Sequence, residues 1–158
     1  MNNKEIERKF LVKTSDIRNV ISKVHGSRIH QGYLGNEPVV RVRTIDDGAK
    51  ERGFLTVKGA GFITRSEFEY EIPFADAWSM LLMSHSVVFK TRYKVKHAGH
   101  TWEVDEFLGN NAGLWLAEIE LQHEDEVFDM PPWLNGEVST NPKFTNVELS
   151  KNVETPWI

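Results

Sequence analysis

The 158-residue sequence is 40% hydrophobic and 27% charged, carries a net charge of −4 and contains no cysteine. This length and hydrophobic content suit one core, so we expect a single domain over residues 1–158, while the lack of cysteine excludes disulfides and thiolate metal or redox sites. No apolar run approaches the length of a transmembrane helix and the acidic balance argues against nucleic-acid binding, so we expect a cytoplasmic protein without membrane or nucleic-acid partners.

Apolar and polar residues alternate with a period of two along most of the chain, which predicts β-strands. Eight strands are expected, at residues 4–13, 28–35, 38–44, 51–58, 64–72, 86–97, 100–107 and 114–123. Residues 17–24 and 74–82 instead show the apolar spacing of helices, and Thr14 or Ser15 could cap the first of them. The segment after Pro131-Pro132 is expected to be irregular. The pattern predicts a mainly β fold of the α+β class with the helices packed outside the sheet.

The predicted strands have one apolar face and one charged face, because residues two apart point to the same side. The basic residues on the charged faces are Lys9, Arg41, Arg43, Lys58, Lys90, Arg92 and Lys94. The acidic residues on them are Glu5, Glu7, Glu67, Glu69, Glu71, Glu103, Asp105, Glu118 and Glu120. Most strands carry a single sign of charge, whereas ordinary surfaces mix the two.

Two interpretations of these faces remain open. They could be the solvated side of an antiparallel sheet, where opposite charges on neighbouring strands aid pairing. Alternatively, the sheet closes and the charged faces line its interior. In that case the cations would bind a polyanion, and a hard cation such as Mg²⁺ or Mn²⁺ would lie between the carboxylates and the phosphates.

The opening pattern Glu5-x-Glu7-x-Lys9 is followed in order by further charged motifs. These are Arg41-Val42-Arg43, Leu55-Thr56-Val57-Lys58-Gly59, Glu67-Phe68-Glu69-Tyr70-Glu71, Lys90-Thr91-Arg92-Tyr93, Trp102-Glu103-Val104-Asp105 and Ala117-Glu118-Ile119-Glu120-Leu121. Together they resemble the CYTH domain, or triphosphate tunnel metalloenzyme, superfamily over residues 4–123. The chain length and Gln31-Gly32-Tyr33-Leu34 are similar to the short bacterial branch. Phe144-Thr145-Asn146 departs from the Tyr-Ser-Asn expected there.

This resemblance implies an eight-stranded antiparallel closed β-barrel, a tunnel that hydrolyses or cyclises triphosphates with Mg²⁺ or Mn²⁺. It implies a first metal at Glu5, Glu7 and Glu120, and a second metal or its waters at Glu69, Asp105 and Glu118. The implied phosphate ligands are Lys9, Arg41, Arg43, Lys58 and Arg92, with Lys90 and Lys94 as further candidates. The residues expected to carry catalysis are Glu5, Glu7, Lys9, Arg41 and Arg92. Glu67, Glu71 and Glu103 are expected to hold the cations in place through salt bridges.

Three functions are compatible with these residues. The first is metal-dependent hydrolysis of a small-molecule triphosphate, with inorganic triphosphate as the expected substrate, by a monomer or homodimer. The second is an adenylate cyclase of the same superfamily, which would form cyclic AMP and pyrophosphate from ATP. The third is a polyphosphate- or nucleotide-binding module without catalysis, for which the carboxylates would have no evident purpose.

Overall fold

The computed structural model describes residues 3–152 and is dominated by antiparallel β-structure. Its strands are β1 (Lys4–Val12), β2 (Gly26–Asn36), β3 (Val39–Asp46), β4 (Glu51–Lys58), β5 (Thr64–Ile72), β6 (Ser86–His97), β7 (His100–Phe107), β8 (Trp115–Glu120) and β9 (Leu134–Glu137). Its α-helices are α1 (Thr14–Ile21), α2 (Phe74–Leu82) and α3 (Asn146–Ser150), and two short 3-10 helices are η1 (Gly109–Asn111) and η2 (Pro142–Phe144).

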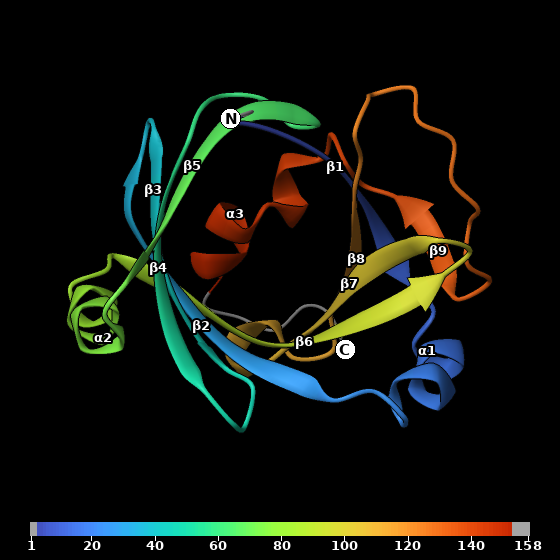
Figure 1. The fold of residues 1–158 in the computed structure, drawn as a ribbon, viewed down its shortest axis with the longest axis horizontal. Helices are drawn as coiled ribbons and strands as arrows, with labels where there is room; N and C mark the ends of the chain where they lie inside the picture. The colour runs from blue at the N-terminus through green and yellow to red at the C-terminus, as the bar shows by residue number, and fades with distance from the viewer. Residues whose placement is uncertain (1–2, 153–158) are drawn as a thin grey trace.

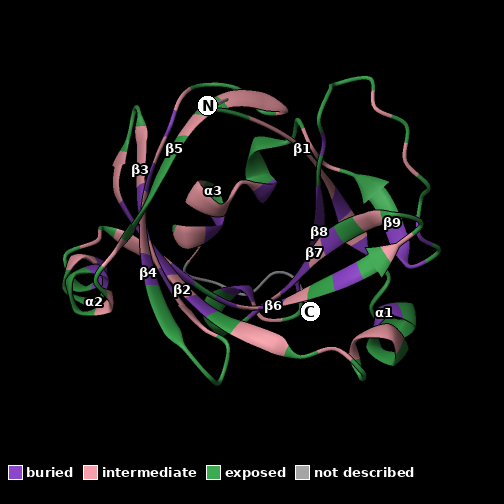
Figure 2. Ribbon diagram, viewed as in Figure 1, coloured by how far each residue is buried: buried purple, intermediate pink, exposed green. Residues whose placement is uncertain are grey.

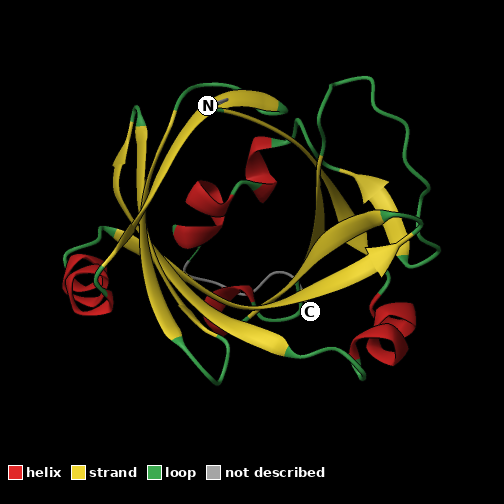
Figure 3. Ribbon diagram, viewed as in Figure 1, coloured by secondary structure: helices red, strands yellow, loops and turns green. Residues whose placement is uncertain are grey.

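Eight strands close into a barrel in the order β5-β4-β3-β2-β6-β7-β8-β1. The ring is visible end-on in Figure 1 and in the secondary-structure colours of Figure 3. A short antiparallel pairing of β1 with β5 completes it, with Lys4 opposite Ser66 and Ile6 opposite Thr64. The ninth strand, β9, lies outside the ring against β1. The expected closed eight-stranded antiparallel barrel is therefore confirmed.

The hairpin between β6 and β7 fixes which charged residues face each other. Ala98 and Gly99 both have positive φ, 48° and 82°, as in the two-residue turns whose twist matches that of the flanking strands. The register that follows places Arg92 opposite Asp105. A cation and an anion are thereby aligned inside the barrel.

The outward faces of the strands are mostly apolar, and many of their residues form the core together with the helices, although Phe68 and Tyr70 of β5 are exposed. Helix α1 inserts Ile17 into a cluster that contains Trp102, Val104 and Ile119. Helix α2 packs Ala77 and Leu81 against Val42 on the opposite side of the barrel. Figure 2 shows buried residues along the strands and exposed residues on the outer sides of α1 and α2. The predicted arrangement of helices outside the sheet is thus confirmed.

Both predicted helices exist, although the start of the first differs from the expectation. Helix α1 already includes Thr14 and Ser15, and its N-cap residue is Lys13, which makes no side-chain capping bond. Helix α2 begins at Phe74 directly after Pro73. The predicted strands agree with β1 to β8 to within a few residues at their ends.

The expectation of an irregular tail is wrong. Beyond Pro131-Pro132 the chain forms β9, η2 and α3. Strand β9 is joined to β1 by the bidentate ion pair of Arg8 with Glu137, whose shortest N–O distance is 2.6 Å. Helix α3 then lies within the ring of strands in Figure 1 and contributes to the wall of the interior cavity. The tail is a structural part of the barrel.

Within residues 3–152, no helix has the length and apolar character needed to cross a membrane.

Candidate active site

The barrel encloses a cavity of about 270 Å³ with a charged lining. Seven carboxylates line it: Glu5, Glu7, Glu67, Glu69, Glu103, Glu118 and Glu120. Seven cationic side chains line it as well: Lys9, Arg41, Arg43, Lys58, Arg65, Lys90 and Arg92. The remaining lining includes Tyr33 and a group from the tail: Ser139, Thr145, Asn146 and Val147. Such a lining suits an ionic ligand.

The two signs of charge occupy different halves of the barrel wall. The adjacent strands β4, β3, β2 and β6 form a basic arc that carries Lys58, Arg41, Arg43, Lys90 and Arg92. The adjacent strands β7, β8, β1 and β5 form an acidic arc that carries all seven lining carboxylates. On the acidic arc, the described cations that line the cavity are Lys9 and Arg65. The cavity therefore presents a cationic wall opposite an anionic wall.

The basic arc includes two arginines of β3, Arg41 and Arg43. Arg41 is 7% exposed, and its Nη2 contacts Thr56 Oγ1 at 3.2 Å and Glu69 Oε2 at 3.3 Å. Its buried Nε has no hydrogen-bond partner among the described residues. Arg43 donates from Nε to Gln31 Oε1 at 3.0 Å. Burial, together with the charges of Arg41 and Arg92, lowers the pKa of Arg43 to about 10. An anion bound at this wall would accept hydrogen bonds from these guanidinium groups and neutralise their charge.

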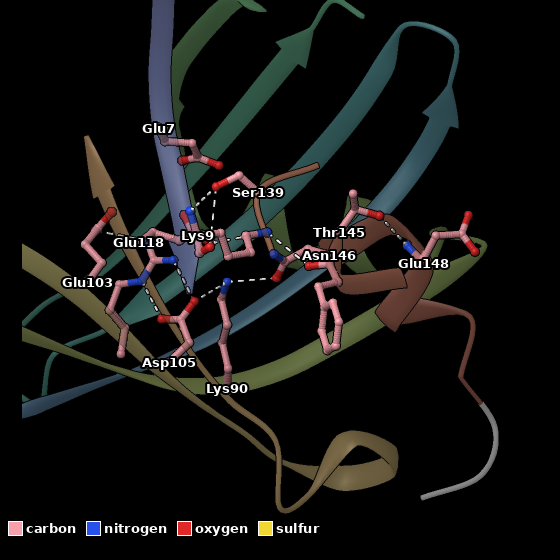
Figure 4. A network of polar contacts seen from close by, with 12 residues as sticks. Glu7, Lys9, Lys90, Glu103, Asp105, Glu118, Ser139, Thr145, Asn146 and Glu148 are labelled. Carbon is pink, nitrogen blue, oxygen red and sulfur yellow. Dashed lines mark hydrogen bonds and ion pairs between the residues drawn. The ribbon is translucent and has the colours of Figure 1, made fainter. Parts of the chain in front are cut away.

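Asp105 joins two cations of β6 into one buried cluster, shown in Figure 4. Arg92 donates to both carboxylate oxygens of Asp105, at 2.7 and 2.8 Å, and also to Glu103 at 3.0 Å. Lys90 Nζ lies 2.9 Å from Asp105 Oδ2 and donates to Asn146 Oδ1 at 2.9 Å. Burial lowers the pKa of Lys90 to about 7, with Arg92 and Arg43 acting in the same direction against Asp105.

The carboxylates of the acidic arc are crowded. Glu7 lies directly opposite Glu120 across the β1–β8 pairing. Burial, and then the charges of Glu118 and Glu5, raise the pKa of Glu7 to about 8. A hydrogen bond links Glu7 to Glu118, whose own pKa is held well below its usual range by Lys9 and neighbouring cations despite burial. Burial and the charge of Glu5 raise the pKa of Glu120. In the metal-free protein, a proton held among these carboxyl groups partly relieves their mutual repulsion.

The same crowding fits a divalent cation. Among residues 3–152, no three Asp, Glu or His side chains are gathered as a ready-made metal site. Mg²⁺, however, is usually held by one or two carboxylates, with water and substrate oxygens as the other ligands. A cation between facing carboxylates such as Glu7 and Glu120 would replace the proton and remove the repulsion. The all-oxygen donor set matches a hard cation.

The structure brings most of the predicted site residues together around one cavity. These are Glu5, Glu7, Lys9, Arg41, Arg43, Lys58, Glu69, Lys90, Arg92, Glu118 and Glu120. Of the expected salt bridges, Glu67 lies 3.1 Å from Lys58 and Glu103 lies 3.0 Å from Arg92. Glu71 instead pairs with the exposed Arg52 at 2.8 Å, away from the cavity.

Two predicted residues need correction. Lys94 is exposed and does not line the cavity, because β6 is 12 residues long and extends past it. Asp105 is 1% exposed and is not part of the cavity lining; both of its oxygens accept from Arg92 and Oδ2 also pairs with Lys90, so it does not face a metal ion in the cavity. Asp105 orients the two cations instead.

Several lining residues were absent from the prediction. Arg65 lies on β5 two residues before Glu67, so the same period of two places it inside the barrel. Tyr33 lies on β2, and its hydroxyl accepts a hydrogen bond from the buried Gln31 at 2.8 Å. The tail shows no periodicity that would place its residues inside the barrel, although the resemblance to the family marks the position of Phe144-Thr145-Asn146.

The tail is tied to both arcs by hydrogen bonds that span the sequence. Lys9 Nζ donates to the carbonyl of Phe144 at 3.0 Å, and Lys9 N donates to Ser139 Oγ at 2.9 Å. Asn146 Oδ1 accepts from Gln31 at 3.1 Å as well as from Lys90. Thr145 caps α3 by accepting from the backbone of Glu148 at 3.3 Å (Figure 4). The tail thus fixes the positions of cations that face the cavity.

Comparison with known proteins agrees with this architecture. The CYTH domain family matches residues 3–151 of the chain. An inorganic triphosphatase of Acetivibrio thermocellus is 46% identical over 154 residues, which cover 94% of each chain. An inorganic triphosphatase of Nitrosomonas europaea is 33% identical over 155 residues, which cover 94% of this chain and 98% of that protein.

Solved structures show the same fold. The crystal structure of the inorganic triphosphatase NE1496 matches with a TM-score of 0.65 and 30% identity over 95% of this chain and 96% of that one. The PH1819 protein of Pyrococcus horikoshii shares the fold with a TM-score of 0.57 and 24% identity, over 77% of this chain and 80% of that one. From the family match across nearly all of its length and from these relatives, the chain belongs to the CYTH domain family.

Proposed function

We propose that this protein is a divalent-metal-dependent triphosphatase whose substrate is inorganic triphosphate. The observation that carries the proposal is the division of the cavity wall into a basic and an acidic arc. A polyanion alone would be attracted by one arc and repelled by the other. A polyanion together with divalent cations satisfies both. The inorganic triphosphatases that resemble this chain over most of its length support the choice of substrate.

The acidic arc would hold the metal. Glu5, Glu7 and Glu120 are the proposed ligands of a first Mg²⁺ or Mn²⁺, with Glu69 and Glu118 near a second ion or its waters. The bound metal would neutralise charge on the phosphate oxygens and lower the pKa of the attacking water.

The basic arc would bind and orient the triphosphate. Phosphoryl transfer depends mainly on positioning and on stabilisation of the transferred group's charge. Arg41 and Arg43 offer guanidinium donors from adjacent inward positions of β3, and Lys58 and Arg92 add charge on either side. Salt bridges to Glu67 and Glu103 hold these flanking cations in place, so little reorganisation is needed when the substrate enters.

The lining favours inorganic triphosphate over a nucleotide. A nucleoside would need apolar or stacking surface, whereas Val39, Phe62 and Val147 are the main apolar side chains among the described residues of the lining. The tail occupies part of the interior and limits the cavity to about 270 Å³. A compact, fully charged substrate suits this space.

Product analysis tests the proposal. The protein would be incubated with inorganic triphosphate, ATP or thiamine triphosphate, each with Mg²⁺, Mn²⁺ or a chelator. We expect orthophosphate and pyrophosphate from inorganic triphosphate, at a higher kcat/KM than for the other substrates and only with metal. Cyclic AMP and pyrophosphate from ATP would establish a cyclase instead. Metal-modulated binding of triphosphate without any turnover would establish a binding module.

A further inference from the structure

Arg65 is a cation on the acidic arc, directly beside two proposed metal ligands. It is the register partner of Glu5 in the short β1–β5 pairing that closes the barrel. Its side chain is 20% exposed and lines the cavity. Its position therefore differs from that of Arg41, Arg43 and Arg92, which belong to the basic arc.

The contacts of Arg65 are those of a loosely held counter-ion. Arg65 Nε lies 3.5 Å from Glu5 Oε1, and Nη2 lies 3.8 Å from Glu7 Oε1. The buried Nε makes no hydrogen bond with any described residue. Lys58, in contrast, donates to both oxygens of Glu5 at 3.0 and 3.2 Å. Arg65 thus lies beside the two carboxylates while its buried Nε makes no hydrogen bond with a described residue.

These contacts place Arg65 in competition with a metal ion. A cation bound by Glu5 and Glu7 would neutralise their negative charge and repel the guanidinium of Arg65 beside them. A guanidinium has five N–H donors in a planar fork that matches phosphate oxygens. An anion bound in the cavity would therefore supply an acceptor for the Nε that makes no hydrogen bond with a described residue.

We propose that Arg65 couples metal binding to triphosphate binding: it stays beside Glu5 and Glu7 when no metal is bound, and it donates to the triphosphate when the metal takes its place. This inference rests on the proposed function. When the metal binds alone, competition with Arg65 lowers its affinity. Triphosphate gives Arg65 a new partner and so restores the affinity of the metal, as thermodynamic linkage requires. The two ligands then bind cooperatively, so the cavity takes up metal and substrate together.

Calorimetric titrations of Arg65→Gln test the proposal without any measurement of turnover. Mn²⁺ would be titrated in the absence of phosphates at mildly alkaline pH, and inorganic triphosphate would be titrated in the presence of a chelator. We expect Mn²⁺ to bind about fivefold more tightly than to the wild type, the size expected for losing one partly exposed ion pair. We expect triphosphate to bind about tenfold more weakly, because a charge-assisted donor is lost.

The opposite signs of the two shifts separate this effect from damage to the fold, which would weaken both. Arg52→Gln is the matched control, because Arg52 also pairs with a glutamate of β5 but lies at an exposed position outside the cavity. Arg65→Lys, which keeps the charge but loses the fork, is expected to bind Mn²⁺ as the wild type does and triphosphate more weakly.

Each outcome is decisive. Unchanged or weaker Mn²⁺ binding by Arg65→Gln, or triphosphate binding equal to that of the wild type, overturns the role of Arg65 while the proposed function stands. Failure of the wild type to bind Mn²⁺ at all overturns the proposed metal site, and the inference with it.

Discussion

Arg41 shows at the scale of one residue why the basic arc suits phosphate. Its guanidinium is nearly buried, is held by Thr56 and Glu69 through one nitrogen, and keeps Nε without a hydrogen-bond partner among the described residues. Leaving a buried donor unpaired is costly unless a ligand completes it. The side chain is therefore arranged for an acceptor in the cavity.

Arg41→Lys should lower kcat/KM for inorganic triphosphate by at least about tenfold, because the planar fork is lost while the charge remains. Steady-state kinetics on the purified variant measure this. Arg52→Lys serves as the control, since Arg52 pairs with Glu71 on the exposed surface. Wild-type kinetics for Arg41→Lys would show that Arg41 does not bind the phosphates.

Glu7 makes the stability of the metal-free protein depend on pH. Its pKa is raised from 4.5 to about 8, so the folded protein binds a proton that the unfolded chain releases between these values. The stabilisation is fully present below pH 4.5 and is lost as the pH rises through about 8. Urea denaturation in a chelator should show stability falling across this window.

Glu7→Gln should flatten that fall, because glutamine does not titrate. Glu71→Gln is the control, since Glu71 lies outside the cavity and its pKa is lowered by Arg52. Equal slopes for the wild type and Glu7→Gln would contradict the assignment of the raised pKa to Glu7.

The period of two in the sequence predicts which way a side chain points, but not how deep it lies. It placed Glu5, Glu7 and Arg41 on the charged faces, and the resemblance to the family implied that these faces line the interior, where the structure has them. It could not show that Lys94 lies beyond the cavity, or that Asp105 is satisfied by Arg92 and Lys90. Depth depends on the stagger of neighbouring strands, which alternation along one strand does not record.

Among the elements, the tail departs most from expectation. Strand β9 and helix α3 are only four and five residues long, and neither shows a clear apolar period. Their stability comes from partners far away in sequence, such as the hydrogen bond of Gln31 to Asn146 across 115 positions. Local pattern predicts long strands well and misses segments that tertiary contacts hold.

Asn146 is the residue through which the tail supports the cavity wall. Its Oδ1 accepts from Lys90 and from Gln31, so Asn146→Ala removes one hydrogen-bond acceptor from each of these buried groups. We expect a loss of about 1–3 kcal/mol in the free energy of unfolding, measured by urea denaturation.

Asn110→Ala is the matched control, because Asn110 makes an exposed hydrogen bond to the backbone of Asn152. Asn110→Ala should lower the free energy of unfolding by clearly less than Asn146→Ala does. If both variants have the same stability, the tail does not brace the barrel through Asn146.

For the whole molecule, the separation of charge into two arcs follows from the strand order. Each strand carries mostly one sign of charge in the sequence, and the order β5-β4-β3-β2-β6-β7-β8-β1 brings strands of like charge together. Alternation along single strands does not fix that order, since many orders satisfy the same pattern. Because the barrel is closed, the charged faces of single strands combine into a basic wall and an acidic wall on opposite sides of the cavity.

The central claim is that both arcs are needed at once, and paired variants test it most directly. Orthophosphate release from inorganic triphosphate would be measured with Mn²⁺ and with a chelator for the wild type, Glu7→Gln on the acidic arc, Arg43→Gln on the basic arc and Arg52→Gln as the control. We predict that each arc variant, and the chelator, lowers the rate by about a hundredfold or more, while Arg52→Gln retains the wild-type rate. A wild-type rate in either arc variant, or undiminished turnover in the chelator, would contradict the account.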